Sequence, residues 1–290
     1  MKKGILIVNA FLNAGKYIEI YEWLSNAAAK CNIELIIKTN AEYLVRNDNS
    51  TIFPKTPECD FVLFWDKDVR LAKAFEQAGI PVFNSADAIA CCDNKALTFD
   101  RLAEKIRMPK TFRIPMTFPA IGYPTYEFLD AIEKELGFPY IIKECCGSFG
   151  AQVYLINNRN DAVNTLIKTG GRECIAQEFI SSSIGRDIRI HTVGDKVITS
   201  MIRYNENDFR ANITNGGSMQ YYEPNNAQIK IALDAARILK LDFAGIDLLF
   251  GDNDEPILCE VNSNAHFRNI YDCTKVNVAE AILNHINDCI

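Results

Sequence analysis

The strongest chemical signal in the sequence is a pair of carboxylates in the last predicted β-hairpin, where AGIDLLF and PILCEVN flank a Gly-Asp-Asn-Asp turn. If this turn is centred between Asn253 and Asp254, Asp247 faces Glu260, and alternation along the strand puts Asn262 on the same face as Glu260. Opposed like charges are destabilising without a cation, and hard oxygen ligands suit Mg²⁺ or Mn²⁺. The hairpin therefore predicts a metal site. The alternative is that one carboxylate caps a turn or pairs with a lysine.

Two lysines and a glycine loop indicate phosphate chemistry. Lys143 ends an apolar strand just before the loop from Gly147 through Ser148 to Gly150, and Lys95 opens a predicted helix. A lysine can neutralise phosphate oxygens, and glycines let backbone N–H groups approach them closely. Each signal alone has a plainer explanation, because a lysine at a strand end is usually solvated and the G-x-x-G pattern is common.

A nucleotide base and its sugar have candidates further along the chain. The segment QEFI, residues 177–180, lies between two predicted sub-domains, where ligand crevices are favoured and an adenine could bond to the backbone. An ordinary core strand is the alternative. The polar residues downstream could bind a ribose, phosphates or a substrate carboxylate, or could pair with one another on the surface. They are Asp187, Arg189, Arg203, Arg210 and Asn212.

The elements that position these residues divide the chain into three predicted parts, 1–90, 91–182 and 183–290. In the first part, short apolar strands alternate with helices near 17–30 and 69–78. This alternation predicts an open, mostly parallel α/β domain, because parallel strands need helical crossovers that cover both faces of the sheet. The fold class is therefore α/β followed by α+β.

The second and third parts are predicted to be α+β sub-domains. In the second, a helix at 95–105 precedes a proline-rich stretch that cannot sustain regular structure, a helix capped by Thr125, a hairpin of YIIKE and AQVYLI, a helix at 161–168 and the strand CIAQEFI. In the third, the hairpin of GRDIRIHTV and KVITSMIRY precedes a helix at 228–240, the carboxylate hairpin and a tail helix at 277–287.

Composition limits the partners of the chain. It has 290 residues, of which 48% are hydrophobic and 23% charged, which is ordinary for a globular protein. Its formal net charge of −6 argues against nucleic acid as a partner. The apolar runs are too short to predict a signal peptide or a membrane span. Ten cysteines without C-x-x-C spacing predict reduced thiols in a cytoplasmic protein, and three histidines leave few candidates for zinc.

Taken in order, these segments resemble the ATP-grasp family, and most closely its RimK-type α-L-glutamate ligases. The resemblance covers about residues 91–270 and is carried by CDNKALTFDRLAEKI, YIIKECCGSFGAQVYLI, IAQEFI, GRDIRIHTVGDKVITSMIRY, DFRANITNGG and GIDLLF…PILCEVNSNAHF. It implies an ATP-grasp fold in which two α+β sub-domains clasp ATP after an N-terminal α/β domain. The runs ECCGSFG and SNAHFRNI depart from the family pattern, and both border the expected acceptor region, so they bear on which substrate is used.

The resemblance implies a role for each candidate, from the phosphates of ATP to its base. The phosphates would be held by Lys95, Lys143, Gly147, Ser148 and Gly150. The adenine and the ribose would be held by Glu178, Phe179, Ile180 and Asp187. Catalysis and binding at the phosphate end would fall to Arg210 and Asn212. One or two Mg²⁺ or Mn²⁺ ions would be bound by Asp247, Glu260 and Asn262, with Glu260 bridging.

The implied reaction joins a carboxylate to an amine through an acyl-phosphate, adding an amino acid such as L-glutamate to a peptide, a protein tail or a small molecule. No side-chain nucleophile is required, because positioning and charge neutralisation carry the rate. The alternatives are another ATP-grasp ligase, such as a D-alanine-type dipeptide ligase, and a silent nucleotide-binding module, which the complete metal set disfavours. The N-terminal domain and the loop at 205–226 are expected to choose the acceptor. A homo-oligomer stays open.

Overall fold

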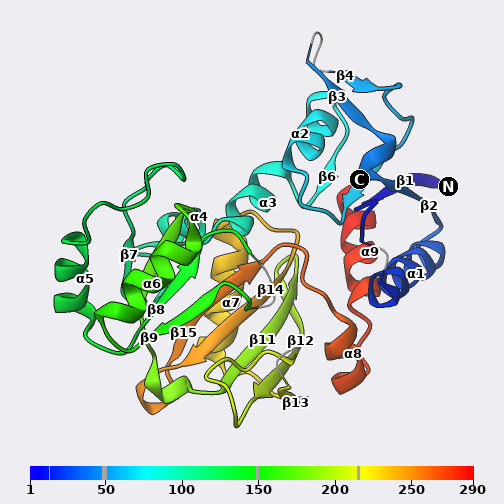
Figure 1. Cartoon of the computed structure of the whole chain (residues 1–290). Coiled ribbons are helices and arrows are strands. Elements are labelled where there is room, and N and C mark those ends of the chain that lie inside the picture. The colour runs from blue at the N-terminus through cyan, green and yellow to red at the C-terminus, as the bar shows by residue number, and fades with distance from the viewer. Residues whose placement is uncertain (13, 48–50, 148–149, 214–215) are drawn as a thin grey trace.

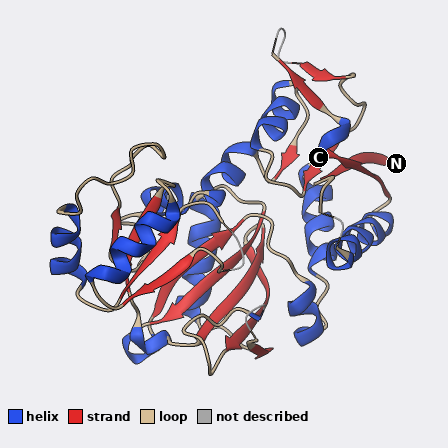
Figure 2. Ribbon diagram, viewed as in Figure 1, coloured by secondary structure: helices blue, strands red, loops and turns tan. Residues whose placement is uncertain are grey.

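The computed structural model describes residues 1–12, 14–47, 51–147, 150–213 and 216–290. In these ranges, three sheets of four or five strands and one two-stranded ribbon are covered by helices (Figures 1 and 2). None of the helices there is long and apolar enough to span a membrane. The three larger sheets follow one another along the chain, so each predicted part contributes one sheet.

The N-terminal sheet is open and parallel, as the alternation of strands and helices predicts. Its strands are β1 (Lys2–Val8), β2 (Ile33–Thr39), β5 (Phe61–Phe64) and β6 (Val82–Phe83). They lie in the order β2-β1-β5-β6, and each neighbouring pair runs parallel. The crossover helix α1 (Gly15–Lys30) buries one apolar face around Leu24, and Asp68 caps α2 (Val69–Gln77) through a hydrogen bond from Leu71 N at 3.1 Å.

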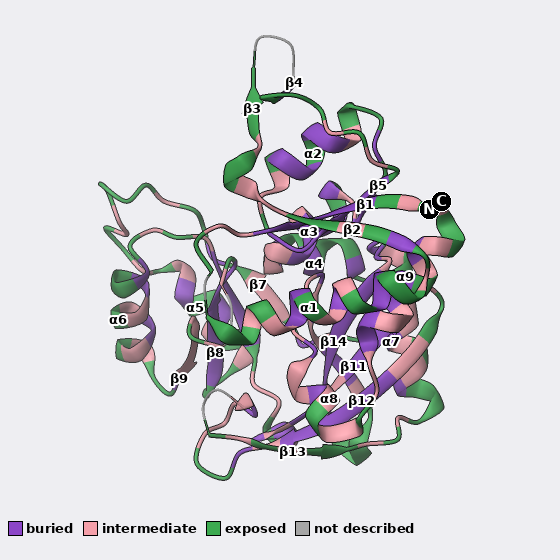
Figure 3. Ribbon diagram, turned by 90° about the vertical axis from the view of Figure 1, so that its right-hand side faces the viewer, coloured by how far each residue is buried: buried purple, intermediate pink, exposed green. Residues whose placement is uncertain are grey.

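Some short elements of this part have no signal in the sequence pattern. They are η1 (Asn40–Glu42), β3 (Leu44–Arg46), β4 (Thr51–Phe53) and α3 (Ala86–Asp93). The ribbon of β3 and β4 is antiparallel and three residues long, too short for an alternation to show. Most of it is exposed, in contrast to the largely buried central strands β1 and β5 of the parallel sheet (Figure 3).

The middle sheet is antiparallel, in the order β7-β10-β8-β9. The strands are β7 (Thr111–Arg113), β8 (Tyr140–Glu144), β9 (Val153–Ile156) and β10 (Cys174–Glu178). The helices of this part of the chain are α4 (Lys95–Leu102), α5 (Phe128–Leu136) and α6 (Arg159–Thr169). The hairpin of β8 and β9 and the helix α6 confirm their predictions.

Two predictions for this segment are wrong. The proline-rich stretch does hold regular structure, because β7 lies in it and pairs with β10. As the edge strand, β7 needs a partner on one side only, so the prolines that flank it interrupt no ladder. The predicted cap of α5 is also wrong, because Glu127 rather than Thr125 precedes the helix and no side chain bonds to its first turn.

The last sheet is antiparallel and carries most of the predicted chemistry. Its order is β13-β12-β11-β14-β15. The elements are η2 (Ser181–Ser183), β11 (Arg186–Val193), β12 (Lys196–Tyr204), β13 (Ser218–Tyr221), α7 (Asn226–Ile238), β14 (Phe243–Phe250), η4 (Asp252–Asp254), β15 (Pro256–Asn262), α8 (Arg268–Thr274) and α9 (Val278–Cys289). The helix α7 covers one face, where Ala232 and Ala235 share a core with Ile190 and Leu248. The elements β13 and α8 were not predicted.

The tail helix α9 returns to the N-terminal part of the chain. It packs beside α1, and Ile282 and Ile286 lie in one buried cluster with Leu24 and Phe61 (Figure 1). The Nζ atom of Lys2 also donates to the carbonyl oxygen of Asn287 at 2.9 Å. The last helix therefore completes the core beneath the first sheet.

The register of β14 and β15 corrects one assumption made from the sequence. Near the turn, Leu248 faces Leu258, which centres the turn on Asn253 and not between Asn253 and Asp254. An irregularity follows in which Cys259 is the extra residue, so that Asp247 faces Glu260 after all. The facing pair is confirmed, but a β-bulge produces it.

Candidate active site

A pocket lies between the middle and last sheets, with walls from β8, β9 and β10 on one side and β11, β12, β14 and β15 on the other. Most of the predicted site residues line it. These are Lys95, Lys143, Gly150, Glu178, Phe179, Ile180, Asp187, Arg210, Asn212, Asp247 and Glu260. Gly147 and Asn262 line a neighbouring pocket instead, and Ser148 lies outside the described residues. We call the first of these the inter-sheet pocket.

Part of the lining of the inter-sheet pocket is apolar. Ile141 and Val153 line it from the middle sheet and Leu249 from the last. Phe179, just after β10, meets Phe209 edge to face, with ring centroids 6.1 Å apart. Fixed apolar walls of this kind suit a flat heteroaromatic ring, because the ring can bury its faces there.

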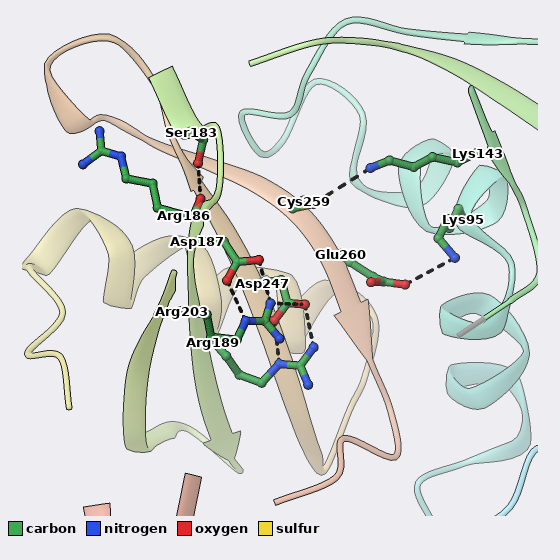
Figure 4. A network of polar contacts seen from close by, with 10 residues as sticks. All are labelled: Lys95, Lys143, Ser183, Arg186, Asp187, Arg189, Arg203, Asp247, Cys259 and Glu260. Carbon is green, nitrogen blue, oxygen red and sulfur yellow. Dashed lines mark hydrogen bonds and ion pairs between the residues drawn. The ribbon is translucent and has the colours of Figure 1, made fainter. Parts of the chain in front are cut away.

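Two lysines also line the inter-sheet pocket, one from β8 and one from α4. Lys143 is only 8% exposed in β8, and its Nζ lies 3.9 Å from the Cys259 sulfur. Lys95 opens α4, and its Nζ lies 3.3 Å from a Glu260 oxygen (Figure 4). The Lys95 backbone N–H donates to the Cys145 carbonyl at 3.0 Å, which ties the start of α4 to the end of β8. Both ammonium groups are thus held close to the bulged strand β15.

The predicted polar cluster pairs internally, but in the core and not on the surface. Arg203 donates to both oxygens of Asp187, at 2.6 and 2.7 Å, and both residues are buried. Arg189 donates to both oxygens of Asp247, each at 2.6 Å, and Arg203 Nη2 lies 3.1 Å from the same carboxylate (Figure 4). Burial opposes ionisation of Asp247, yet the charges of Arg189 and Arg203 outweigh it and hold its pKa at about 2. Asp247 is therefore a carboxylate at neutral pH.

The carboxylate hairpin fits a hard divalent cation. Asp247 and Glu260 face each other in register, and a carboxylate has about four acceptor sites, so Asp247 keeps some capacity beyond its two bonds from Arg189. The side-chain oxygen of Asn262 is the atom that would bind a cation, whereas its buried nitrogen has no hydrogen-bond partner in the described structure and needs an acceptor from a bound molecule. No group of three or more His, Cys, Asp or Glu side chains gathers for a metal in the described ranges. An ion here would therefore depend on the amide and on oxygens of a bound nucleotide.

Arg210 links the glycine loop to the segment that follows β12. Its Nη1 donates to the Gly150 carbonyl at 2.6 Å, while its other nitrogens bond to Asp208 at 3.0 and 2.7 Å. Asn212 lies against the same glycine, because a Cβ added at Gly150 would come within 2.9 Å of the Asn212 side-chain oxygen. Gly150 also has φ +71°, which L side chains rarely adopt. A glycine is therefore needed where the loop meets these two residues.

The neighbouring pocket, which we call the junction pocket, lies where the N-terminal domain meets the last sheet. Three residues line both pockets: Gly150, Asn212 and Glu260. The N-terminal part supplies Leu12, Tyr17, Tyr21, Trp65, Asp66 and Lys67. The strand end of β15 and the residues after it supply Asn262 through His266. A molecule in the junction pocket would thus meet a molecule in the inter-sheet pocket at Glu260.

Sequence reasoning missed several residues of these pockets. Cys259 lines the inter-sheet pocket beside Glu260, although neighbours in a regular strand point to opposite faces; only the bulge brings both to one side. Asp66 lines the junction pocket and belongs to no motif in the sequence. The available signal was its position, since ligands of open α/β sheets bind beyond the carboxyl ends of the strands.

Comparison with known proteins identifies the family. The RimK-like ATP-grasp domain matches residues 92–286. An uncharacterised protein of Mycoplasma pneumoniae is 31% identical over 278 residues, covering 94% of this chain and 95% of that protein. A protein of Maridesulfovibrio salexigens named as a probable alpha-L-glutamate ligase is 34% identical over 220 residues, covering 74% of this chain and 70% of that protein.

A solved structure shares the fold over nearly the whole chain. The D-alanine–D-alanine ligase of Bacillus anthracis in complex with ATP superposes with a TM-score of 0.75 at 17% identity, covering 99% of this chain and 97% of that one. Together with the matched domain, this confirms the predicted fold class. The chain belongs to the RimK-like ATP-grasp family.

Proposed function

We propose that this chain uses ATP and Mg²⁺ to activate a carboxylate as an acyl-phosphate and then joins it to the amine of an amino acid. Membership of its family makes the chain an ATP-dependent carboxylate–amine ligase. The proposal adds the class of the amine, the ion and the residues that act. L-glutamate is the first amino acid to test, because the Maridesulfovibrio relative is named as a glutamate ligase.

The observation that carries the proposal is the position of Glu260. This carboxylate lines both pockets, beside Lys95 and opposite Asp247. A nucleotide in the inter-sheet pocket and a carboxylate in the junction pocket would therefore approach each other at one acidic side chain with a cation already beside it. Phosphoryl transfer needs this arrangement, since its catalysis is mostly positioning and charge neutralisation.

The nucleotide is assigned to the inter-sheet pocket along its length. The base lies against Phe179 and Ile180, with Glu178 beside them, and Asp187 faces the ribose. The phosphates extend toward Lys143 and Lys95, where Gly147 and Gly150 flank them and Arg210 and Asn212 lie across the loop. The support for this direction is the register of β8 and β10, in which Glu178 faces Tyr140 and Ile175 faces Lys143, so Phe179 and Lys143 lie toward opposite ends of the paired strands.

Charge neutralisation is the main work of the chain's own side chains. As the carboxylate attacks the terminal phosphate, negative charge grows on the phosphate oxygens, and the ammonium groups of Lys95 and Lys143 stabilise it. Asp247, Glu260 and Asn262 would hold one or two Mg²⁺ ions, which when bound supply further neutralisation of the phosphates. Arg210 and Asn212, which lie against Gly150, would help to keep water away from the acyl-phosphate until the amine attacks.

The experiment is a measurement of ADP release. The purified chain is given ATP, Mg²⁺ and a panel of L- and D-amino acids, with and without carboxylate acceptors, and products are identified by mass spectrometry. We expect ADP and phosphate to form in equal amounts with an amide-linked product that carries an L-amino acid.

Each result separates the proposal from the two alternatives. Turnover with D-amino acids alone would favour a dipeptide ligase of the D-alanine type. Tight ATP binding without turnover for any member of the panel would favour a silent nucleotide-binding module. Either result would end the proposal in its present form.

A further inference from the structure

The junction pocket contains a buried carboxylate that the reaction described above does not use. Asp66 directly follows Trp65 at the carboxyl end of β5, is only 7% exposed, and lines the pocket. The Asn9 amide donates to its two oxygens at 3.2 and 3.3 Å, and the Lys67 backbone N–H donates at 2.7 Å. Asn264 donates to its carbonyl oxygen at 2.8 Å, from the segment that follows β15. The carboxylate is thus held by two donors of the N-terminal part, and the backbone of Asp66 is held from the other side of the pocket.

Asp66 differs from the other acidic groups of the pocket in its charge balance. Each of the others is paired with a cation of the chain: Asp93 with Lys67, and Glu260 with Lys95. In the described part of the chain, Asp66 accepts hydrogen bonds from neutral donors and has no cation within ion-pair distance. Burial raises the pKa of its carboxyl group, and the hydrogen bonds from Lys67 N–H and Asn9 and the more distant charge of Lys67 do not offset this effect. A buried unpaired carboxylate is costly, and a bound cation would offset that cost.

The walls around Asp66 also suit a cation. Three aromatic side chains, Tyr17, Tyr21 and Trp65, line the junction pocket. The Trp65 ring is held by stacking on Phe243, with centroids 5.6 Å apart, and Tyr17 meets His266 edge to face. Aromatic rings attract ammonium groups, most strongly where water is excluded. Burial, followed by the charge of Asp66, raises the pKa of Tyr21 to about 12, so its hydroxyl stays protonated and neutral.

We propose that Asp66 binds a positively charged group of the carboxylate substrate, so that this ligase selects a substrate that bears both a carboxylate and an ammonium group. The inference rests on the function proposed above, because it assigns the junction pocket to the carboxylate substrate. Such a molecule extends from Glu260, where its carboxylate meets the nucleotide, to Asp66, where its ammonium replaces water. Amino acids and peptides with a free amine have this chemistry. Asp66 is a specificity-determining residue and takes no part in the transfer itself.

The test compares Asp66→Asn with Asp60→Asn. Asparagine has nearly the shape of aspartate and keeps one acceptor for the Asn9 and Lys67 donors, so the fold should persist. Asp60 is an exposed residue just before the other end of the same strand, outside both pockets, and its substitution makes the same change in charge. Melting temperatures and ATP affinity of both variants establish that each is folded.

The probes are matched pairs that differ in one positive charge: dipeptides with a free or an acetylated amine, and L-ornithine against L-norvaline. Dissociation constants are measured with Mg²⁺ and a non-hydrolysable ATP analogue present, using the fluorescence of Trp65 in a Trp23→Phe background. The sequence holds two tryptophans, so Trp65 is then the single reporter. We expect the charged member of a pair to bind at least tenfold more tightly, and this preference to fall at least tenfold in Asp66→Asn but not in Asp60→Asn.

Binding and turnover together keep the two proposals apart. If charged probes bind through Asp66 but no ADP is released, the ligase proposal fails and the assignment of Asp66 stands. If ADP is released while no pair shows a preference for the charge, or while Asp66→Asn keeps the preference, the assignment of Asp66 is overturned and the ligase proposal stands.

Discussion

Arg189 holds both carboxylate oxygens of Asp247 at 2.6 Å, whereas the facing Glu260 is paired with Lys95 at 3.3 Å. The two carboxylates of one hairpin are therefore neutralised by cations from different parts of the chain. Asp247 is almost fully buried in its pair, and the Glu260 side chain is 31% exposed at the meeting point of the two pockets. Glu260 is thus the more accessible of the two to an ion or a substrate.

Replacing Glu260 by glutamine should remove turnover and leave the fold intact. The change deletes the accessible negative charge of the hairpin but keeps the size of the side chain, so we expect kcat to fall by about 10²- to 10³-fold, the usual cost of losing one preorganised charge. ADP release measures the effect, and circular dichroism follows the fold. Glu255→Gln, at the exposed end of the same hairpin, is the control. Near-normal turnover in Glu260→Gln would argue against the metal assignment.

The buried pair of Arg203 and Asp187 should be strongly coupled in stability. Arg203→Ala leaves the Asp187 carboxylate buried without its partner, so we expect a loss of about 3–5 kcal/mol in the free energy of unfolding. The double variant Arg203→Met with Asp187→Leu should recover much of that loss, because neither side chain then carries a buried charge. Urea denaturation measures all three proteins. Equal instability of the single and double variants would show that the pair is not the cause.

Histidine 191 should make the protein sensitive to acid. Burial, with the nearby charge of Arg189, lowers the pKa of His191 from 6.5 to about 3. As the pH falls from 6.5 toward 3, His191 becomes protonated in the unfolded chain but stays neutral in the folded chain. The free energy of unfolding therefore falls with falling pH, by up to about 1.4 kcal/mol per pH unit. The variant His191→Leu should show a flatter dependence in this window by urea denaturation. Parallel curves for the two proteins would contradict the assignment.

Gly245 should control the shape of the junction pocket. It faces Asn262 across β14 and β15, and a Cβ there would lie 2.4 Å from the Cβ of Ala265. Gly245→Ala must therefore displace the segment after β15, so we expect a raised KM for the carboxylate substrate and a small change in ATP affinity. Gly15→Ala is the matched control, because nothing lies within 4 Å of a Cβ at Gly15. An unchanged KM in Gly245→Ala would show that the segment does not shape substrate binding.

The sequence predicted the regular elements well because their signals are local. The hairpin of β11 and β12, the helices α6 and α7 and the parallel strands each follow from alternation or helical spacing over a few residues. The elements it missed, such as β7 and the ribbon of β3 and β4, are three residues long, too short for an alternation to show, and β7 also owes its pairing to the distant strand β10.

The sequence indicated which residues gather at the inter-sheet pocket but not how they pair with one another. Lys143 and Asp247 could be chosen by type and position, yet nothing in the strand pattern shows that Asp247 is held by Arg189 or that Cys259 bulges toward Lys143. Those relationships depend on how two sheets and a β-bulge meet. The junction pocket was least accessible to sequence reasoning, because Asp66 and Asn264 lie 198 residues apart.

The packing of α9 against α1 has a consequence for the order in which the protein is made. During synthesis the first sheet emerges early, but Leu24 and Phe61 share their buried cluster with Ile282 and Ile286, which the ribosome adds only after the middle and last sheets. The nascent first sheet must wait with one apolar side uncovered until α9 has been made, and a chain cut short before residue 278 would keep that side exposed to chaperones and proteases.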